Sequence, residues 1–222
     1  MKPKNLVVLL CVLVAAGVAA ADVNGSSLKP PAGASVAIIV FEDLECPSCA
    51  QAAPLLEQAA KTYNVPLIIR DFPLRQHLWA FDAAVLARYI DDKYGRETSL
   101  AFRDYIYLYQ PYVTKDNLRS YAEKFAASKK LDLPFMIDPR GEIAARIKVD
   151  QDAGQQIGLD ETPTVVVVSA KDWKHVKPLS DLYLTIERMK QAAGPAPAAK
   201  PPAKSAPAKS SPARKTVNKT SQ

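Results

Sequence analysis

Two cysteines separated by two residues stand where a predicted strand gives way to a predicted helix. Residues 36–41 form a short, apolar, β-branched run, which predicts a buried strand. Residues 50–63 are mostly strong helix formers, which predicts a helix. Between them, Pro47 suits the first helical position, where no backbone N–H is needed. The pair Cys46 and Cys49 is therefore expected at a strand-to-helix junction, with Cys46 at the positive end of the helix.

This position favours redox chemistry, because the helix N-terminus stabilises the reactive thiolate. A structural disulfide is disfavoured, since a C-x-x-C loop closes almost no chain entropy. Zinc needs two further ligands, and His77 and His175 are far apart in the sequence. Haem attachment needs a histidine where Ala50 stands, and a copper carrier would want nearby Met or His ligands. We predict a redox-active cysteine pair that uses neither a metal nor an organic cofactor.

The N-terminus predicts export. Residues 1–21 combine a basic start, an apolar core and small residues before Asp22, as in a cleaved signal peptide. The alternative is an uncleaved anchor, but the apolar stretch of residues 6–21 is only sixteen residues long, below the roughly 20 that a spanning helix needs. A lipoprotein would need a small residue before its acylated cysteine, but two leucines precede Cys11. Cleavage would leave Cys46 and Cys49 as the only cysteines, in the periplasm or another oxidising space of the cell envelope.

The mature chain is expected to have three parts. These are an irregular lead-in (residues 22–35), one folded domain (36–193) with a helical insertion at about 75–158, and an Ala/Pro/Lys-rich tail (194–222). The predicted strands are 36–41, 65–70, 164–168 and 173–177, and the predicted helices are 50–63, 79–94, 98–109, about 114–127, about 139–158 and 182–193. The first two strands should be parallel and the last two should form a hairpin. This order predicts an α/β fold with a mixed sheet.

The net charge of +6 comes from the two ends of the chain. Eight cationic residues and no acidic ones lie in the signal and the tail, so the segment between them carries about −2. A nearly neutral domain gives no electrostatic support to nucleic-acid binding. The tail is too poor in large apolar residues to fold. It is either simply solvated or in contact with anionic polymers or lipids of the cell envelope.

Several segments resemble the DsbA-like thiol–disulfide oxidoreductases, a branch of the thioredoxin fold. Residues 41–49 resemble their active-site stretch, and residues 71–74 with His77 resemble the entry to their helical insertion. Glu161-Thr162-Pro163-Thr164 resembles their cis-proline loop, and Pro54 matches a helix-kinking proline of many thioredoxin folds. The resemblance implies a thioredoxin-like fold with a central mixed sheet and an inserted α-helical domain.

Roles for the site residues follow from position and from this resemblance. Cys46 should be exposed and attack first, and Cys49 should be shielded and resolve the mixed disulfide. The resemblance implies that the Thr162–Pro163 bond is cis and that this segment binds an extended substrate chain. Pro47 and Ser48 would tune the site, with the Ser48 hydroxyl donating toward Cys46.

The surroundings predict a milder oxidant than the extreme of the family. Strongly oxidising members carry histidine in place of Ser48 and a buried acid where this chain has Val40. Glu42, Asp43 and Glu45 are expected to be solvated; pointing inward, they would oppose the thiolate. We expect the Cys46 pKa to lie below the free value. His77 is expected to cap or pack, and His175 to lie on the surface.

Together these features predict an exported thiol–disulfide oxidoreductase that donates its disulfide to reduced or misoxidised exported proteins. The resemblance implies recharging by a membrane quinone-linked thiol oxidase, DsbB-like or VKOR-like. Two alternatives stay open. The same fold could act as a reductase or isomerase, or it could be a peptide-binding, chaperone-like module whose thiols are incidental.

Overall fold

The computed structural model of this protein describes residues 28–194. The predicted signal peptide, with Cys11, and the tail from residue 195 onward lie outside the described residues, as do residues 22–27 of the lead-in. Residues 28–35 contain neither helix nor strand, as expected of an irregular lead-in.

A four-stranded mixed sheet forms the centre of the fold, in the order β2-β1-β3-β4. The strands are β1 (Val36–Glu42), β2 (Leu67–Asp71), β3 (Thr164–Ser169) and β4 (Trp173–His175). β1 pairs with β2 in parallel and with β3 antiparallel, and β3 pairs with β4 antiparallel. The predicted parallel pair and the predicted hairpin are therefore confirmed. All seven residues of β1 are buried, because the strand lies inside the sheet and is covered on both faces.

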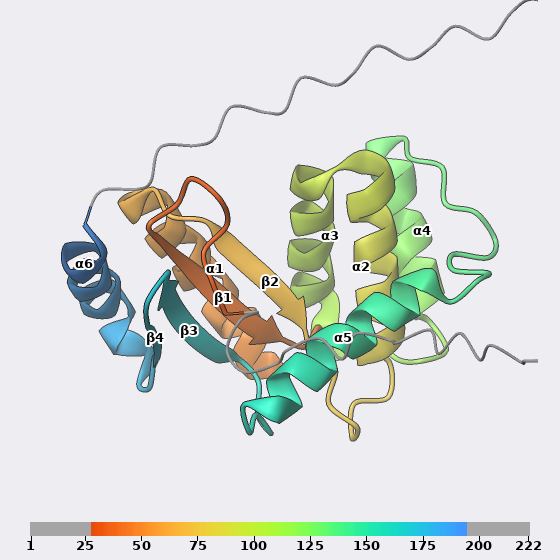
Figure 1. The fold of residues 1–222 in the computed structure, drawn as a ribbon. Coiled ribbons are helices and arrows are strands. Elements are labelled where there is room, and N and C mark those ends of the chain that lie inside the picture. The colour runs from red at the N-terminus through yellow and green to blue at the C-terminus, as the bar shows by residue number, and fades with distance from the viewer. Residues whose placement is uncertain (1–27, 195–222) are drawn as a thin grey trace, which may run out of the picture.

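Both faces of the sheet are covered, because successive residues of β1 point to opposite faces and are apolar on each. Val36, Ile38 and Val40 face α1 (Pro47–Tyr63) and α6 (Leu182–Ala193), in one continuous core. Ala37, Ile39 and Phe41 face the other way, where they pack with Phe72 and with residues just beyond α5. In Figure 1, α1 and α6 lie with the sheet on the left of the view, whereas α2, α3 and α4 lie together on the right.

Three helices between β2 and β3 in the sequence form a second body with its own core (Figure 1). They are α2 (Ala80–Tyr94), α3 (Arg96–Tyr109), which is followed by a short 3-10 turn η1 (Gln110–Tyr112), and α4 (Leu118–Lys129). Phe102 and Ile106 of α3 are fully buried there, and Phe102 meets Phe125 of α4 edge to face at 5.3 Å between ring centroids. The next helix, α5 (Glu142–Gln156), packs on α2 in a separate small cluster and also contacts β2. The architecture is thus a mixed sheet with an inserted helical domain.

The start of α5 differs from the expectation. Asp138 and Pro139 resemble a helix cap and first residue, yet the helix begins at Glu142 after Gly141. Gly141 has a φ of 69°, a left-handed conformation that suits glycine. The Asp138 carboxylate still serves the helix end, since it accepts a hydrogen bond of 2.8 Å from the backbone N–H of Ala144. Asp138 therefore caps from outside the helix.

Gly154 of α5 gives a prediction about packing. A Cβ at this position would lie 2.5 Å from Cε2 of Phe72 and 3.3 Å from Cδ1 of Phe41, both buried rings. We expect Gly154→Ala to lower the free energy of unfolding by about 1–3 kcal/mol despite the better helix propensity of alanine. Urea unfolding measures this. Gln155→Ala, on the exposed face of the same turn, is the matched control; equal effects of the two substitutions would contradict the close approach.

Candidate functional site

The cysteine pair lies at the junction between β1 and α1. Cys46 is the N-cap of α1 with an extended backbone (φ −84°, ψ 118°), and Pro47 occupies the first helical position, as predicted. The carbonyl of Cys46 accepts hydrogen bonds from the N–H groups of Cys49 and Ala50, which closes the first turn. Both cysteines are thiols in this structure.

Their exposure is partly as expected. Cys49 is shielded, with 2% of its surface exposed. The expectation of an exposed Cys46 was wrong, because only 7% of that residue is exposed. The reason is a long-range contact that no local pattern shows: the Cys46 thiol donates a hydrogen bond of 3.2 Å to the carbonyl of Thr162.

The Thr162 segment forms the second wall of the site. The Thr162–Pro163 bond is cis, as the resemblance implied, and β3 begins at the next residue. Because β3 pairs directly with β1, the start of β3 lies beside the end of β1, where Cys46 follows. The Thr162 hydroxyl is buried without a hydrogen-bond partner, which leaves it free to donate to a sulfur anion.

The two thiols have opposite acidities. The pKa of Cys46 is lowered to about 5, first by hydrogen bonding from the Cys49 thiol, against the effect of burial. The Thr162 side chain and the backbone N–H groups of Cys49 and Ser48 lower the pKa of Cys46 further. Burial raises the pKa of Cys49, and so does its hydrogen bond with Cys46. One thiolate at Cys46 is therefore the stable form of the reduced pair at neutral pH.

The difference in acidity between the two thiols predicts the result of a pH titration. The thiolate ultraviolet absorbance of the reduced protein should rise with a midpoint near pH 5, where a free cysteine ionises at about 8.5. In a Cys49→Ala variant the midpoint should move upward, because the largest cause of the lowered pKa is gone. A wild-type midpoint at or above about 8.5 would contradict the geometry.

Pro47 and Ser48 are exposed on the surface of the first turn. The expectation that the Ser48 hydroxyl donates to Cys46 does not match the structure, in which the backbone N–H of Ser48 acts on Cys46. The cause is helical geometry: the amides of the first turn point toward the N-cap, whereas side chains point outward.

The acidic residues before Cys46 are not solvated as expected. Glu42 is 5% exposed and Asp43 is 2% exposed. The Asp43 carboxylate accepts hydrogen bonds of 2.7 Å from the N–H groups of Glu45 and Leu74, and its Oδ2 lies 2.7 Å from Nδ1 of His77. The N–H of Asp43 in turn donates to the Cys49 sulfur at 3.4 Å. Asp43 thus ties the loop before α1 to the loop before α2.

His77 was expected to cap a helix or to pack, and Glu45 is the residue that caps. The Glu45 carboxylate accepts hydrogen bonds of 2.7 and 3.0 Å from the backbone N–H groups of Trp79 and Ala80, at the start of α2. His77 packs against Asp43 instead of capping the helix. His175 is exposed on the edge strand β4, as predicted.

Glu42 belongs to a buried chain of ion pairs that joins the sheet to the helical domain. Nη1 of Arg103 lies 2.8 Å from Oε1 of Glu42, and Nη2 lies 2.9 Å from Oδ1 of Asp71. Arg88 then bridges Asp71 to Asp150 of α5. Arg103 is 5% exposed and Asp71 is 1% exposed, so these charges are paired away from water.

A signal for this network existed in the sequence. Alternation along β1 places Glu42 on the same face as Ile38 and Val40, which is the face that packs against α1. Arg103 adjoins Phe102 within the buried stripe of α3. A charged residue inside an apolar stripe indicates a buried partner of opposite charge.

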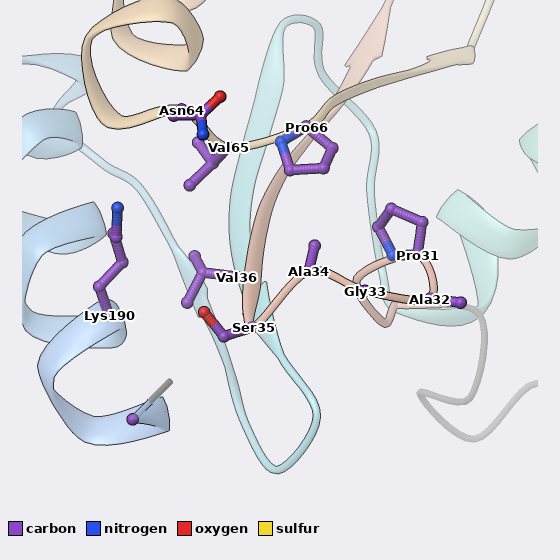
Figure 2. Close-up of a pocket in the computed structure, with 11 residues that line it drawn as sticks. Pro31, Ala32, Gly33, Ala34, Ser35, Val36, Asn64, Val65, Pro66 and Lys190 are labelled. Carbon is purple, nitrogen blue, oxygen red and sulfur yellow. The ribbon is translucent and has the colours of Figure 1, made fainter. Parts of the chain in front are cut away.

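A depression lies at the other end of β1 from the cysteines. Figure 2 shows its lining, which joins the lead-in before β1, the turn between α1 and β2, and the last turn of α6. Its volume is about 710 Å³. Lys190, the ionisable residue among the described lining, donates to the carbonyl of Tyr63 at 2.7 Å. This depression contributes nothing to the cysteine site.

Two further features concern residues 28–194 only. No helix in this part of the chain is long and apolar enough to cross a membrane. No cluster of three or more His, Cys, Asp or Glu side chains is arranged there to hold a metal ion.

Comparison with known proteins gives the family and the fold. The profile of a family described as Thioredoxin matches residues 31–179. The thiol-disulfide exchange protein alpha-DsbA2 from Wolbachia pipientis is similar with a TM-score of 0.59 and 16% identity, over 76% of this chain and 90% of that chain. DsbA2 of Pseudomonas aeruginosa is similar with a TM-score of 0.54 and 22% identity, over 73% and 93% of the two chains. The predicted thioredoxin-like fold with its DsbA-like helical insertion is confirmed.

A curated relative is a longer protein. The Na(+)/H(+) antiporter NhaA 1 of Salinispora arenicola (strain CNS-205) is 27% identical over 148 residues, which make up 66% of this chain and 22% of that protein. The chain therefore spans about a fifth of the length of this relative, and the similarity concerns that part alone.

Proposed function

Because this chain belongs to the thioredoxin family, we propose that it is a protein thiol–disulfide oxidoreductase whose redox group is the Cys46–Cys49 pair. One observation carries the proposal. The Cys46 thiol sits at the N-terminus of α1, 3.2 Å from the carbonyl of Thr162, and the shielded Cys49 follows one turn later. This arrangement gives one acidic, attacking sulfur and one protected, resolving sulfur.

In the oxidase direction, a substrate thiolate attacks Sγ of Cys46 in the Cys46–Cys49 disulfide. The S–S bond breaks, Cys49 leaves with the electron pair, and it takes up a proton. A second substrate thiolate then attacks the substrate sulfur of the mixed disulfide, and Cys46 leaves as a thiolate. Two electrons have passed from the substrate dithiol to the cysteine pair. No separate cofactor enters this sequence, and the acidic Cys46 is the better leaving group.

The acidity of Cys46 supports donation of the disulfide over reduction. A thiolate that is stable at neutral pH stabilises the reduced pair, and a stabilised reduced form makes the disulfide more oxidising. Ser48 carries no positive charge, and Val40 replaces a buried acid, so the chain should be a milder oxidant than the extreme of the family. Thr162 and Pro163 would hold the substrate backbone beside Cys46.

The proposed setting is the periplasm or another extracytoplasmic part of the cell envelope. The signal-like residues 1–21 support export. The substrates would be reduced or misoxidised exported proteins, and the recharging partner would be a membrane quinone-linked thiol oxidase, DsbB-like or VKOR-like. The basic tail would add a contact with anionic envelope material, weakened by salt.

The decisive experiment equilibrates the Cys46–Cys49 pair with glutathione buffers and, in parallel, follows disulfide formation in a reduced, unfolded substrate. We expect a potential between about −120 and −230 mV, together with oxidation of the substrate. A potential at or below about −270 mV would make the protein a reductase. Suppression of substrate aggregation that persists in a Cys46→Ser variant, without disulfide transfer, would replace the enzyme by a chaperone-like binding module.

A further inference from the structure

Asp43, in the loop between β1 and α1, contacts both cysteines through its backbone. Its N–H donates a hydrogen bond of 3.4 Å to the sulfur of Cys49. Its carbonyl accepts a hydrogen bond of 3.1 Å from the N–H of Cys46. Asp43 is 2% exposed, so both contacts are shielded from water. The contact with the Cys49 sulfur has no role in the mechanism given so far.

The N–H of Asp43 is placed where charge develops during exchange. When a substrate thiolate attacks Sγ of Cys46, the S–S bond breaks and its electron pair goes to Sγ of Cys49. Cys49 is 2% exposed, so bulk water cannot stabilise this charge. A fixed N–H aimed at the sulfur stabilises the charge as it forms. In line with this, the hydrogen bond from Asp43 lowers the pKa of Cys49, whereas burial raises it.

The Asp43 carboxylate fixes the direction of that N–H. Oδ1 accepts a hydrogen bond of 2.7 Å from the N–H of Glu45, which makes an Asx-turn of the loop. Oδ2 accepts a hydrogen bond of 2.7 Å from the N–H of Leu74, in the loop before α2. The side chain is fully buried, and hydrogen bonds to a buried carboxylate are strong. The backbone of Asp43 therefore cannot turn away from Cys49 without breaking them.

His77 makes a third contact with the same carboxylate. Its Nδ1 lies 2.7 Å from Oδ2 of Asp43, 34 residues away in the sequence. An ionised carboxylate only accepts, so Nδ1–H donates. The N–H of His77 donates to the carbonyl of Leu74 at 3.0 Å, which closes a turn and sets the position of the ring. The entry to the helical domain is thus connected to the Cys49 sulfur through one aspartate.

We propose that the N–H of Asp43 stabilises the thiolate of Cys49 in the transition state of exchange, and that His77 is the positioning residue that holds this donor through the Asp43 carboxylate. In the reverse step the same N–H stabilises the Cys49 thiolate that attacks Cys46 and expels the substrate sulfur with its electron pair. This rests on the proposed function, because charge reaches Cys49 only if the pair takes part in exchange.

The donor predicts a change in two rates without a change in equilibrium. It acts on a transition state that opening and closing of the disulfide share, so its loss slows both steps by the same factor. The glutathione equilibrium of the pair should stay constant. The pKa of Cys46 should also stay constant, since its causes do not include Asp43 or His77. A general disturbance of the site would move these two quantities.

The test is the His77→Leu variant, which removes Nδ1 and keeps an apolar side chain for packing. Opening of the Cys46–Cys49 disulfide by glutathione is followed at pH 7 by acid quenching and thiol alkylation. Closing is followed as release of glutathione from a Cys46 mixed disulfide. We expect both rates to fall about tenfold, less than the 10²–10³ that follows outright loss of a donor, because the N–H itself remains.

Two further substitutions separate the hydrogen bond from packing. In His77→Asn the amide nitrogen can replace Nδ1 as the donor, so most of both rates should return. His175→Leu removes the exposed histidine of β4 and should leave both rates at the wild-type value. Slow exchange in His77→Leu that His77→Asn does not restore would overturn the positioning role.

Asp43→Asn tests whether the two residues act along one path. An amide has a single acceptor oxygen, so it cannot serve both Glu45 and the loop before α2. This variant should exchange at least as slowly as His77→Leu, and the double variant should be no slower than Asp43→Asn alone, since His77 acts through the carboxylate. Slowing that adds up would overturn the path. Asp43→Asn tests the same contact by itself, should His77→Leu not fold.

The result for the wild type keeps the two proposals apart. Wild-type rates in His77→Leu would overturn the role of His77 and leave the proposed function standing. Slower rates explained by a shifted glutathione equilibrium or a shifted Cys46 pKa would also overturn it, because His77 would then act on Cys46. If glutathione does not open the disulfide of the wild type, the proposed function fails first, and the role of Asp43 and His77 fails with it.

Discussion

Replacing Cys46 with serine is expected to reduce disulfide transfer to background. A serine hydroxyl stays protonated at neutral pH and cannot form the mixed disulfide, so the first bond of the reaction is lost. Substrate oxidation followed by thiol counting measures this effect. Transfer that continues through Cys49 alone would contradict the assignment, because 2% exposure leaves Cys49 out of reach of a protein substrate.

Cys49→Ser should behave in the opposite way and accumulate mixed disulfides. Its Cys46 still exchanges with substrate, but the resolving thiol is gone. Non-reducing electrophoresis and mass spectrometry should find substrate attached at Cys46. Ser120→Ala, an exposed change on α4, is a control that should form and resolve mixed disulfides normally. Equal turnover in Cys49→Ser and Ser120→Ala would remove Cys49 from the mechanism.

Arg103→Met is expected to have the largest effect on stability, a loss of about 3–5 kcal/mol. The substitution keeps much of the side-chain volume but leaves Glu42 and Asp71 buried beside each other without their shared cation. Urea unfolding of the reduced protein measures the loss. Arg146→Met is the matched control: its pair with Asp92 is about half exposed, with side chains 47% and 49% accessible, and should cost at most about 1 kcal/mol.

The loss in Arg103→Met should depend on pH in a defined direction. Burial raises the pKa of Glu42 above its unfolded value, and removing Arg103 removes an opposing effect. An acid with a raised folded pKa destabilises the fold when both states are ionised, and this cost disappears as pH falls through the folded pKa toward about 4.3. The loss should therefore be larger at pH 8 than at pH 5. A loss equal to that of Arg146→Met at both pH values would show that the buried pairs contribute little.

The order of elements could be predicted because it depends on local patterns. Residues 36–41 are apolar throughout and 182–193 are periodic, and both predictions match β1 and α6 within a residue. The helix start near Asp138 was missed by a few residues, since Gly141 allows the chain to turn before the helix begins. Boundaries of this kind depend on backbone conformations that several residues could adopt.

The surroundings of the cysteines were harder to predict because they depend on distant partners. In the sequence, Glu42 and Asp43 resemble surface acids. In the fold, Glu42 pairs with Arg103 of α3, and Asp43 pairs with His77 of the loop before α2. Burial of Cys46 depends on Thr162, which is 116 residues away in the sequence. Local composition carries little information about such contacts, although the alternation of β1 did point Glu42 inward.

The position of β1 has a consequence for the chain during its synthesis. A nascent polypeptide that ends within the helical domain already contains both cysteines and the partner strand β2, but not β3. Its β1 has one open edge, and Cys46 lacks the Thr162 carbonyl and hydroxyl. The site is therefore completed only by the last third of the sequence, so an unfinished chain carries the two thiols without the Thr162 segment that contacts Cys46.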